Sequence, residues 1–175
     1  ATPVRQDGKH PIVYMQCGPI VYRDDAKTKA SERPFAHILS PRFTNYQIPI
    51  EWDEKNIQIQ DIFTDLTLSS DRNNQILKDI HAAIQQGRTI IVLTDRKDHV
   101  DLLVKGIKPD FPDVIDLTGS GTVKQKREKL DFIKSYPSEK PMLIIATGKY
   151  VGEGFDVPRL DTLLLAMPFS WKGTL

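Results

Sequence analysis

From Thr64 onward the chain alternates short apolar runs with longer stretches of helical periodicity. This alternation is typical of βαβ units built around a parallel sheet. Strands are predicted at residues 89–94, 114–117, 142–146 and 162–167. Right-handed crossovers would join them into one sheet of four parallel strands. The run at 89–94 is apolar and β-branched without alternation, which indicates a strand buried on both faces.

A first helix is predicted ahead of the strand at 89–94. Its apolar positions Ile76, Ile80 and Ile84 recur every four residues, so one face would pack on the sheet. Asp71 is placed to cap its start, and Gly87 to end it.

Two further helices are predicted after the strands at 89–94 and 114–117. Asp95 is placed to cap the first of these, and Gly106 to end it. Thr122, followed by Gln125 three residues later, is the signature of a capping box, and this helix would run to about Ser135.

The first sixty residues have a less regular pattern. Two short apolar runs, 12–17 and 20–22, flank Gly18-Pro19 and predict a hairpin, while 36–39 and 46–50 predict further extended segments. We therefore expect an irregular, β-rich segment over residues 1–60, followed by an α/β domain over 61–175.

The composition mainly excludes classes of protein. With 175 residues, 39% hydrophobic and 27% charged, the chain is expected to be a globular protein with one sizeable core. The net charge of +1 gives no global argument for nucleic acid and predicts weak binding by this chain alone. No membrane-spanning run or secretory signal is visible.

Cys17 is the single cysteine, so the chain cannot form an internal disulfide. A reducing, cytoplasmic location is the default expectation, and the thiol is expected to pack in a core. No Cys/His grouping has the spacing of a zinc site, so no metal is predicted.

Polar clusters follow three of the predicted strands. They are Thr94-Asp95-Arg96, Thr118-Gly119-Ser120 and Thr147-Gly148. Because ligands of open α/β sheets bind beyond the carboxyl ends of strands, a row of hydroxyls and backbone amides there suits successive phosphates of a nucleic-acid strand. Taken singly, each cluster is more often a simple helix cap. Their common register favours the binding interpretation.

A glycine-rich loop follows the strand at 142–146. Gly152 and Gly154 permit a close approach of ligand or backbone, and Glu153 and Asp156 place carboxylates beside it. An acid in such a loop can accept a hydrogen bond from a ribose hydroxyl. A turn in which Asp156 bonds only local amides is equally compatible with the sequence.

The stretch 144–158, with Arg159-Leu160-Asp161-Thr162-Leu163 after it, resembles motif V of superfamily-two helicases and translocases. Residues 89–96 resemble motif IV, and 117–119 the strand-end motif that follows it. Ala1-Thr2-Pro3 resembles the end of motif III, as if the chain were an excised piece. The resemblance covers residues 60 to 170. The stretch before residue 60 matches less of the family pattern, and its sequence resembles bacterial members related to type III restriction and nucleotide-excision-repair helicases.

The resemblance implies a three-layer, RecA-like α/β domain, the second of two lobes that close on ATP and move along nucleic acid. It implies a DNA or RNA partner, with DNA preferred, and an N-terminal lobe in the same polypeptide. The nucleic-acid contacts it implies are Thr94, Arg96, Thr118, Gly119, Thr147 and Gly148. The nucleotide contacts it implies are Gly152, Gly154 and Asp156, while Glu153 and Arg159 match less firmly.

Parts of the family pattern are missing. The chain has no G-x-x-x-x-G-K-[ST] phosphate loop, no Asp-Glu pair in a motif II setting, and no Gln-x-x-Gly-Arg of motif VI. ATP and Mg²⁺ are therefore expected mainly on the N-terminal lobe, with no catalytic residue here and no hydrolysis by this piece alone.

Two other functions stay open. A standalone flavodoxin-like module could bind a phosphorylated ligand or a protein, and a degenerate motor lobe could serve as a scaffold. The sequence shows no aromatic platform for stacking bases, since Trp52 and Trp171 stand alone and more often serve packing. DNA and RNA are therefore not distinguished by the residues themselves.

Overall fold

The computed structural model describes residues 10–21, 36–49, 57–148, 150–151 and 155–168. The chain falls into two compact units, Ala1–Phe43 and Thr44–Leu175. Trp52, Trp171, Gly152, Glu153 and Gly154 lie outside the described residues.

The described part of the first unit contains helix α1, His10–Cys17. The helix ends at Gly18, which has a φ of 81° and donates its N–H to the carbonyl oxygen of Tyr14 at 2.9 Å. The predicted strand at 12–17 is therefore wrong, because the left-handed glycine ends a helical turn instead of opening a hairpin. Cys17 is exposed, so the expectation that it packs in a core is also wrong. The described residues 36–49 contain neither helix nor strand.

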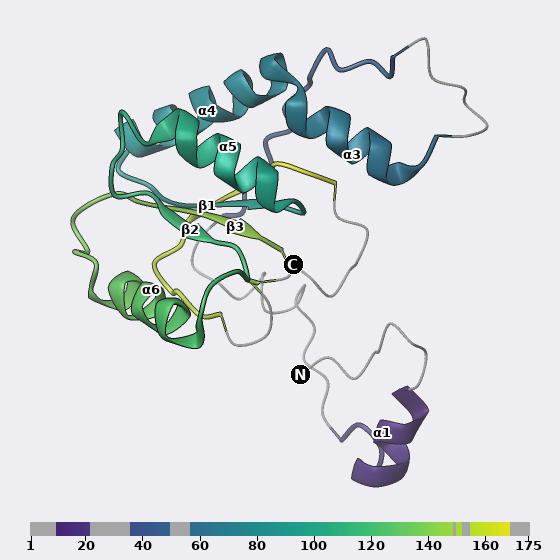
Figure 1. Ribbon diagram of the computed structural model, residues 1–175. Coiled ribbons are helices and arrows are strands. Elements are labelled where there is room, and N and C mark those ends of the chain that lie inside the picture. Colours follow the sequence, from purple (N-terminus) through teal and green to yellow (C-terminus); the bar gives the residue numbers. More distant parts are fainter. Residues whose placement is uncertain (1–9, 22–35, 50–56, 149, 152–154, 169–175) are drawn as a thin grey trace. The chain divides into compact units, whose positions relative to one another are not determined.

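The second unit is built on a sheet of four parallel strands (Figure 1). The strands are β1 (Thr89–Thr94), β2 (Ile115–Leu117), β3 (Met142–Thr147) and β4 (Thr162–Leu165). Their order across the sheet is β2-β3-β1-β4. The prediction of four parallel strands is confirmed. A flavodoxin-like sheet has the order 2-1-3, so the flavodoxin-like topology of the alternative is wrong, while its binding function stays untested.

Helices cover both faces of the sheet, as Figure 1 shows with α4 and α5 on one side and α6 on the other. Two helices precede β1: α3 (Ile59–Leu68) and α4 (Ser70–Gln85). Helix α5 (Lys97–Ile107) follows β1, and α6 (Val123–Ser135) follows β2. Successive residues of β1 serve opposite cores: Ile90 packs with Ile80 of α4, and Ile91 packs with Ile133 of α6. This is the predicted three-layer α/β fold, and it explains why β1 is apolar throughout.

Helix α3 was not predicted, although Ile59, Ile62, Phe63 and Leu66 have helical spacing. The helix spans the expected domain division at residue 60, whereas the compact units divide after Phe43. The division at residue 60 stays a prediction.

Three helix boundaries differ from those predicted. Ser69 occupies the N-cap position of α4, with Asp71 in the first turn, and Arg96 instead of Asp95 occupies that of α5; neither Ser69 nor Arg96 makes a side-chain capping hydrogen bond. Gly106 lies inside α5, where an added Cβ would come within 2.8 Å of a Leu77 methyl carbon. Gly106 therefore permits close packing of α5 on α4 and does not end the helix. The capping box of Thr122 and Gln125, and the end of α6 at Ser135, are confirmed.

Candidate nucleic-acid interface

The predicted polar clusters lie at one edge of the sheet. Thr94 and Thr147 are register partners at the carboxyl ends of β1 and β3. Leu117 pairs with Ala146, which brings Thr118 beside Thr147 on the other side. We call residues 94–96, 118–121 and 147–148 the rim. The topology thus brings the three threonines, far apart in sequence, to adjacent strand ends.

Thr94 is the buried member of this rim. Its side chain is fully buried, and its hydroxyl lies 2.9 Å from Nδ1 of His99, itself fully buried. The N–H of Arg96 reaches the same hydroxyl oxygen at 3.5 Å. The Thr94 hydroxyl is therefore committed inside the protein and is not presented to solvent.

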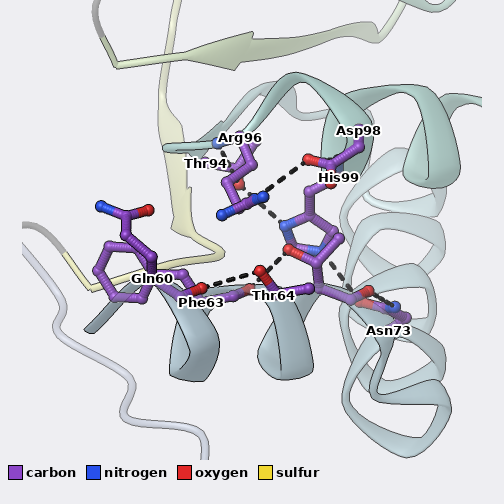
Figure 2. A network of polar contacts seen from close by, with 9 residues as sticks. Gln60, Phe63, Thr64, Asn73, Thr94, Arg96, Asp98 and His99 are labelled. Atoms are coloured by element: carbon purple, nitrogen blue, oxygen red, sulfur yellow. Dashed lines mark hydrogen bonds and ion pairs between the residues drawn. The ribbon is translucent and has the colours of Figure 1, made fainter. Parts of the chain in front are cut away.

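The Thr94 hydroxyl belongs to a buried polar network, part of which Figure 2 shows. The side-chain amide of Asn73 donates to the carbonyl oxygen of Thr67 at 2.7 Å, which turns its oxygen toward His99 Nε2 at 2.9 Å. His99 Nε2 must then donate, and Nδ1 accepts the Thr94 proton. The network joins the end of β1 to helices α3, α4 and α5.

His99 is neutral at pH 7 in this network. Its pKa is lowered from 6.5 to about 4, mainly by burial and next by the positive charge of Arg72, while Asp98 opposes both. A neutral ring is the form that can accept from Thr94 and donate to Asn73 at the same time.

The loop after β2 is more exposed to solvent than Thr94 is. Thr118 is 8% exposed, and its hydroxyl lies 2.6 Å from that of Ser120, while the Ser120 N–H donates to the Thr118 carbonyl oxygen. Gly119 and Ser120 are exposed. Gly121 has a φ of 100°, which lets the chain enter the capped first turn of α6.

At the end of β3, Thr147 is half-buried and Gly148 is buried. The Gly148 N–H donates to the carbonyl oxygen of Thr94 at 3.0 Å, so it is not the unpaired amide that the sequence suggested. The Thr147 carbonyl oxygen accepts from the N–H groups of Tyr150 and Val151 at 2.9 and 3.2 Å. The Thr147 hydroxyl is left as the rim group of this strand.

Two charged residues named by the motif comparison have different surroundings. Arg96 is partly exposed on the rim, with Nε 3.4 Å from Oδ1 of Asp98. Asp156 is exposed, but its neighbours Gly152 and Gly154 lie outside the described residues. Among the described residues no group of His, Cys, Asp and Glu could hold a metal ion.

Arg159 has a structural role. Its guanidinium donates to the carbonyl oxygens of Tyr136, Pro137, Ser138 and Lys140 at 2.7 to 3.1 Å. These four bonds hold the turn between α6 and β3.

Replacing Arg159 by methionine is expected to lower the free energy of unfolding by about 2 kcal/mol, because the four acceptors lose a charged donor while the aliphatic stem is kept. Arg127→Met, at an exposed position of α6, is the control and should change stability by less than about 0.5 kcal/mol. Urea unfolding followed by circular dichroism measures both. Equal stabilities of the two variants would contradict the role assigned to Arg159.

An aromatic and basic group that the sequence patterns did not indicate lies beside the rim. The ammonium of Lys126 lies 5.9 Å from the centroid of the Tyr150 ring, and the ring is within 3.9 Å of a Cβ placed on Gly119. The available signal was Tyr150 itself, three residues after Thr147.

Comparisons with known proteins agree with this fold. No family model matches the chain. Over 108 residues, 59% of this chain, it is 27% identical to Transcript termination protein A18 of Fowlpox virus and covers 22% of that protein. Over the same length it is 30% identical to Transcript termination protein A18 of Cowpox virus (strain Brighton Red) and covers 21% of it. The chain thus spans about a fifth of the length of these relatives.

Among solved structures, T4 UvsW superposes with a TM-score of 0.52 at 20% identity, over 64% of this chain and 22% of that one. This likeness supports the three-layer α/β fold described above. None of the described helices has both the length and the apolar character needed to cross a membrane.

Proposed function

We propose that this chain is the second motor lobe of an ATP-dependent nucleic-acid helicase or translocase, and that its rim contacts the backbone of the bound strand. The observation that carries the proposal is the register of Thr94 with Thr147 and of Leu117 with Ala146, which aligns three strand-end loops at one edge. Hydroxyls and amides in a row can contact successive phosphates without reading bases.

Some of the residues in the rim would contact the nucleic acid, and others would keep the rim in shape. Thr118, Gly119, Thr147 and Arg96 would face the phosphates. Thr94 and Gly148, whose hydroxyl and amide are bonded inside the protein, would hold the rim in shape. Gly152, Gly154 and Asp156 would reach ATP in a longer protein, where an N-terminal lobe supplies the phosphate loop and most contacts to Mg²⁺. Relation to bacterial type III restriction and excision-repair helicases, and a cytoplasmic location, are part of this proposal.

The rim is tested by replacing Thr147 with valine, which removes the hydroxyl and keeps the shape. The affinity of the 175-residue chain for a fluorescein-labelled single-stranded DNA is expected to fall about three- to tenfold, as for the loss of one typical hydrogen bond worth about 1 kcal/mol. Fluorescence anisotropy at low salt measures it, because near-neutral proteins hold DNA weakly.

Thr162→Val is the matched control. Thr162 is the first residue of β4, so it lies at the amino ends of the strands, away from the rim, and its hydroxyl donates to Asp161 at 2.7 Å. This variant should bind as the wild type does. If Thr147→Val and Thr162→Val bind equally well, the rim does not contact the strand. The same titration with RNA of equal sequence tests the proposed preference for DNA.

A further inference from the structure

An open hollow of about 430 Å³ lies beside the rim. Its walls come from three parts of the chain: the end of β2 with its loop, helix α6, and Tyr150 after β3. The residues that matter here are Thr118, Ser120, Gln125, Lys126, Glu128 and Tyr150. A volume of this order is typical of sites for small organic groups.

The charges of the hollow do not favour an isolated phosphate. Lys126 and Lys129 line it together with Glu128 and Asp116. Lys129 is already committed, since its ammonium lies 2.7 Å from a carboxylate oxygen of Asp116 and 2.9 Å from its carbonyl oxygen. Two positive and two negative side chains leave little net attraction for an anion.

The same walls suit a flat, uncharged ring with polar edges. The Tyr150 ring offers a π-face that already attracts the Lys126 ammonium at 5.9 Å, and Phe132, 46% exposed, adds an apolar wall. Gln125, whose side-chain oxygen accepts from the Thr122 N–H at 2.9 Å, can donate from its amide nitrogen. Glu128 can accept. Stacking on aromatic rings with donors and acceptors at the edge is how unpaired bases are held.

The hollow is continuous with the rim. Thr118 and Ser120 belong to both, and the N–H of Tyr150 donates to the carbonyl oxygen of Thr147 at 2.9 Å. A strand whose phosphates lie on Thr118 and Thr147 therefore has a sugar and base within reach of Tyr150.

We propose that this hollow takes one nucleobase of the bound single strand, stacked on Tyr150. The proposal rests on the rim's contact with the strand. The base displaces the Lys126 ammonium from the ring face, and Lys126 then pairs with the adjoining phosphate. The pocket would hold a base that has left its neighbours, as a strand-separating or translocating protein requires.

The test compares two oligomers of equal length and charge: a single-stranded DNA, and the same backbone made of abasic sites. Tyr150→Leu removes the π-face and keeps an apolar body, because Tyr150 also packs against the core on the α6 side of the sheet. Tyr150→Phe keeps the face. Fluorescence anisotropy is measured for each protein with each oligomer, after circular dichroism has confirmed folding.

The wild type and Tyr150→Phe are expected to bind normal DNA about tenfold more tightly than the abasic oligomer, in line with one stacked base. Tyr150→Leu should lose this preference and bind the abasic oligomer as the wild type does. Lys126→Ala should weaken binding of both oligomers, whereas Lys134→Ala, an exposed position of the same helix, should change neither.

The outcomes separate the two proposals. If the wild type binds both oligomers equally and Thr147→Val weakens both, the rim stands and the base pocket is overturned. If Tyr150→Leu lowers both affinities by the same factor, the pocket is also overturned. If neither oligomer binds, the rim and the pocket both fall.

Discussion

Replacing His99 by leucine is expected to lower the free energy of unfolding by about 3 kcal/mol. The imidazole joins the Thr94 hydroxyl to the Asn73 amide at 2.9 Å on each side, and all three residues are buried. Leucine has a similar volume but leaves an oxygen of Asn73 and the hydroxyl of Thr94 buried without their partner. Each such group costs about 1 to 3 kcal/mol.

His81→Leu is the matched control. The His81 side chain is 38% exposed and lies 3.0 Å from a carboxylate oxygen of Asp110 at the surface. Its replacement should cost less than about 1 kcal/mol. Urea denaturation at pH 7 measures both variants. Stabilities of His99→Leu and His81→Leu within error of each other would show that the network does not stabilise the domain.

The same network predicts a dependence on pH. Because the pKa of His99 falls from 6.5 in the unfolded chain to about 4 in the folded protein, the unfolded state binds the extra proton between these values. The stability due to the neutral ring is present above pH 6.5 and is lost as the pH falls toward 4, by about 3 kcal/mol in all. The His99→Leu variant has no imidazole to protonate, so it does not lose this stability. The difference in free energy of unfolding between the wild type and the variant should therefore shrink on acidification. A difference that stays constant from pH 7 to pH 4.5 would contradict a neutral, buried His99.

Replacing Asp156 by asparagine is expected to reduce nucleic-acid-stimulated ATP hydrolysis about 10- to 100-fold in a longer protein that joins this chain to a lobe carrying a phosphate loop. The exposed carboxylate would accept a hydrogen bond from the ribose while the preceding loop responds to the strand on the rim. Asparagine keeps the size and removes the charge.

Asp131→Asn, at an exposed position of α6, is the control and should leave the rate unchanged. Steady-state ATPase assays with and without single-stranded DNA separate coupling from basal hydrolysis. An unchanged stimulated rate in Asp156→Asn would show that Asp156 does not couple strand binding to ATP hydrolysis. A loss confined to the basal rate would assign Asp156 to another step of the nucleotide cycle.

The candidate site was only partly predictable. The sequence located the strand ends and therefore the rim, because Thr94, Thr118 and Thr147 each follow a buried run. It did not reveal that Thr94 bonds to His99, or that the Gly148 amide bonds to Thr94. Those partners compete with a ligand for the same groups, and the competition is decided by packing across strands.

Local patterns by themselves determined the four strands, their parallel direction in βαβ units and the capped start of α6, but not the order of the strands across the sheet. A short, continuous run of β-branched and apolar residues such as 89–94 favours a buried strand, and Thr122 with Gln125 provides the local hydrogen bonds of a capped first turn. Tertiary structure alone decided that the Thr94 hydroxyl faces inward and that Tyr150 lies beside Lys126. These outcomes depend on which distant groups meet, and the periodicity of a sequence carries no information about its contacts at long range.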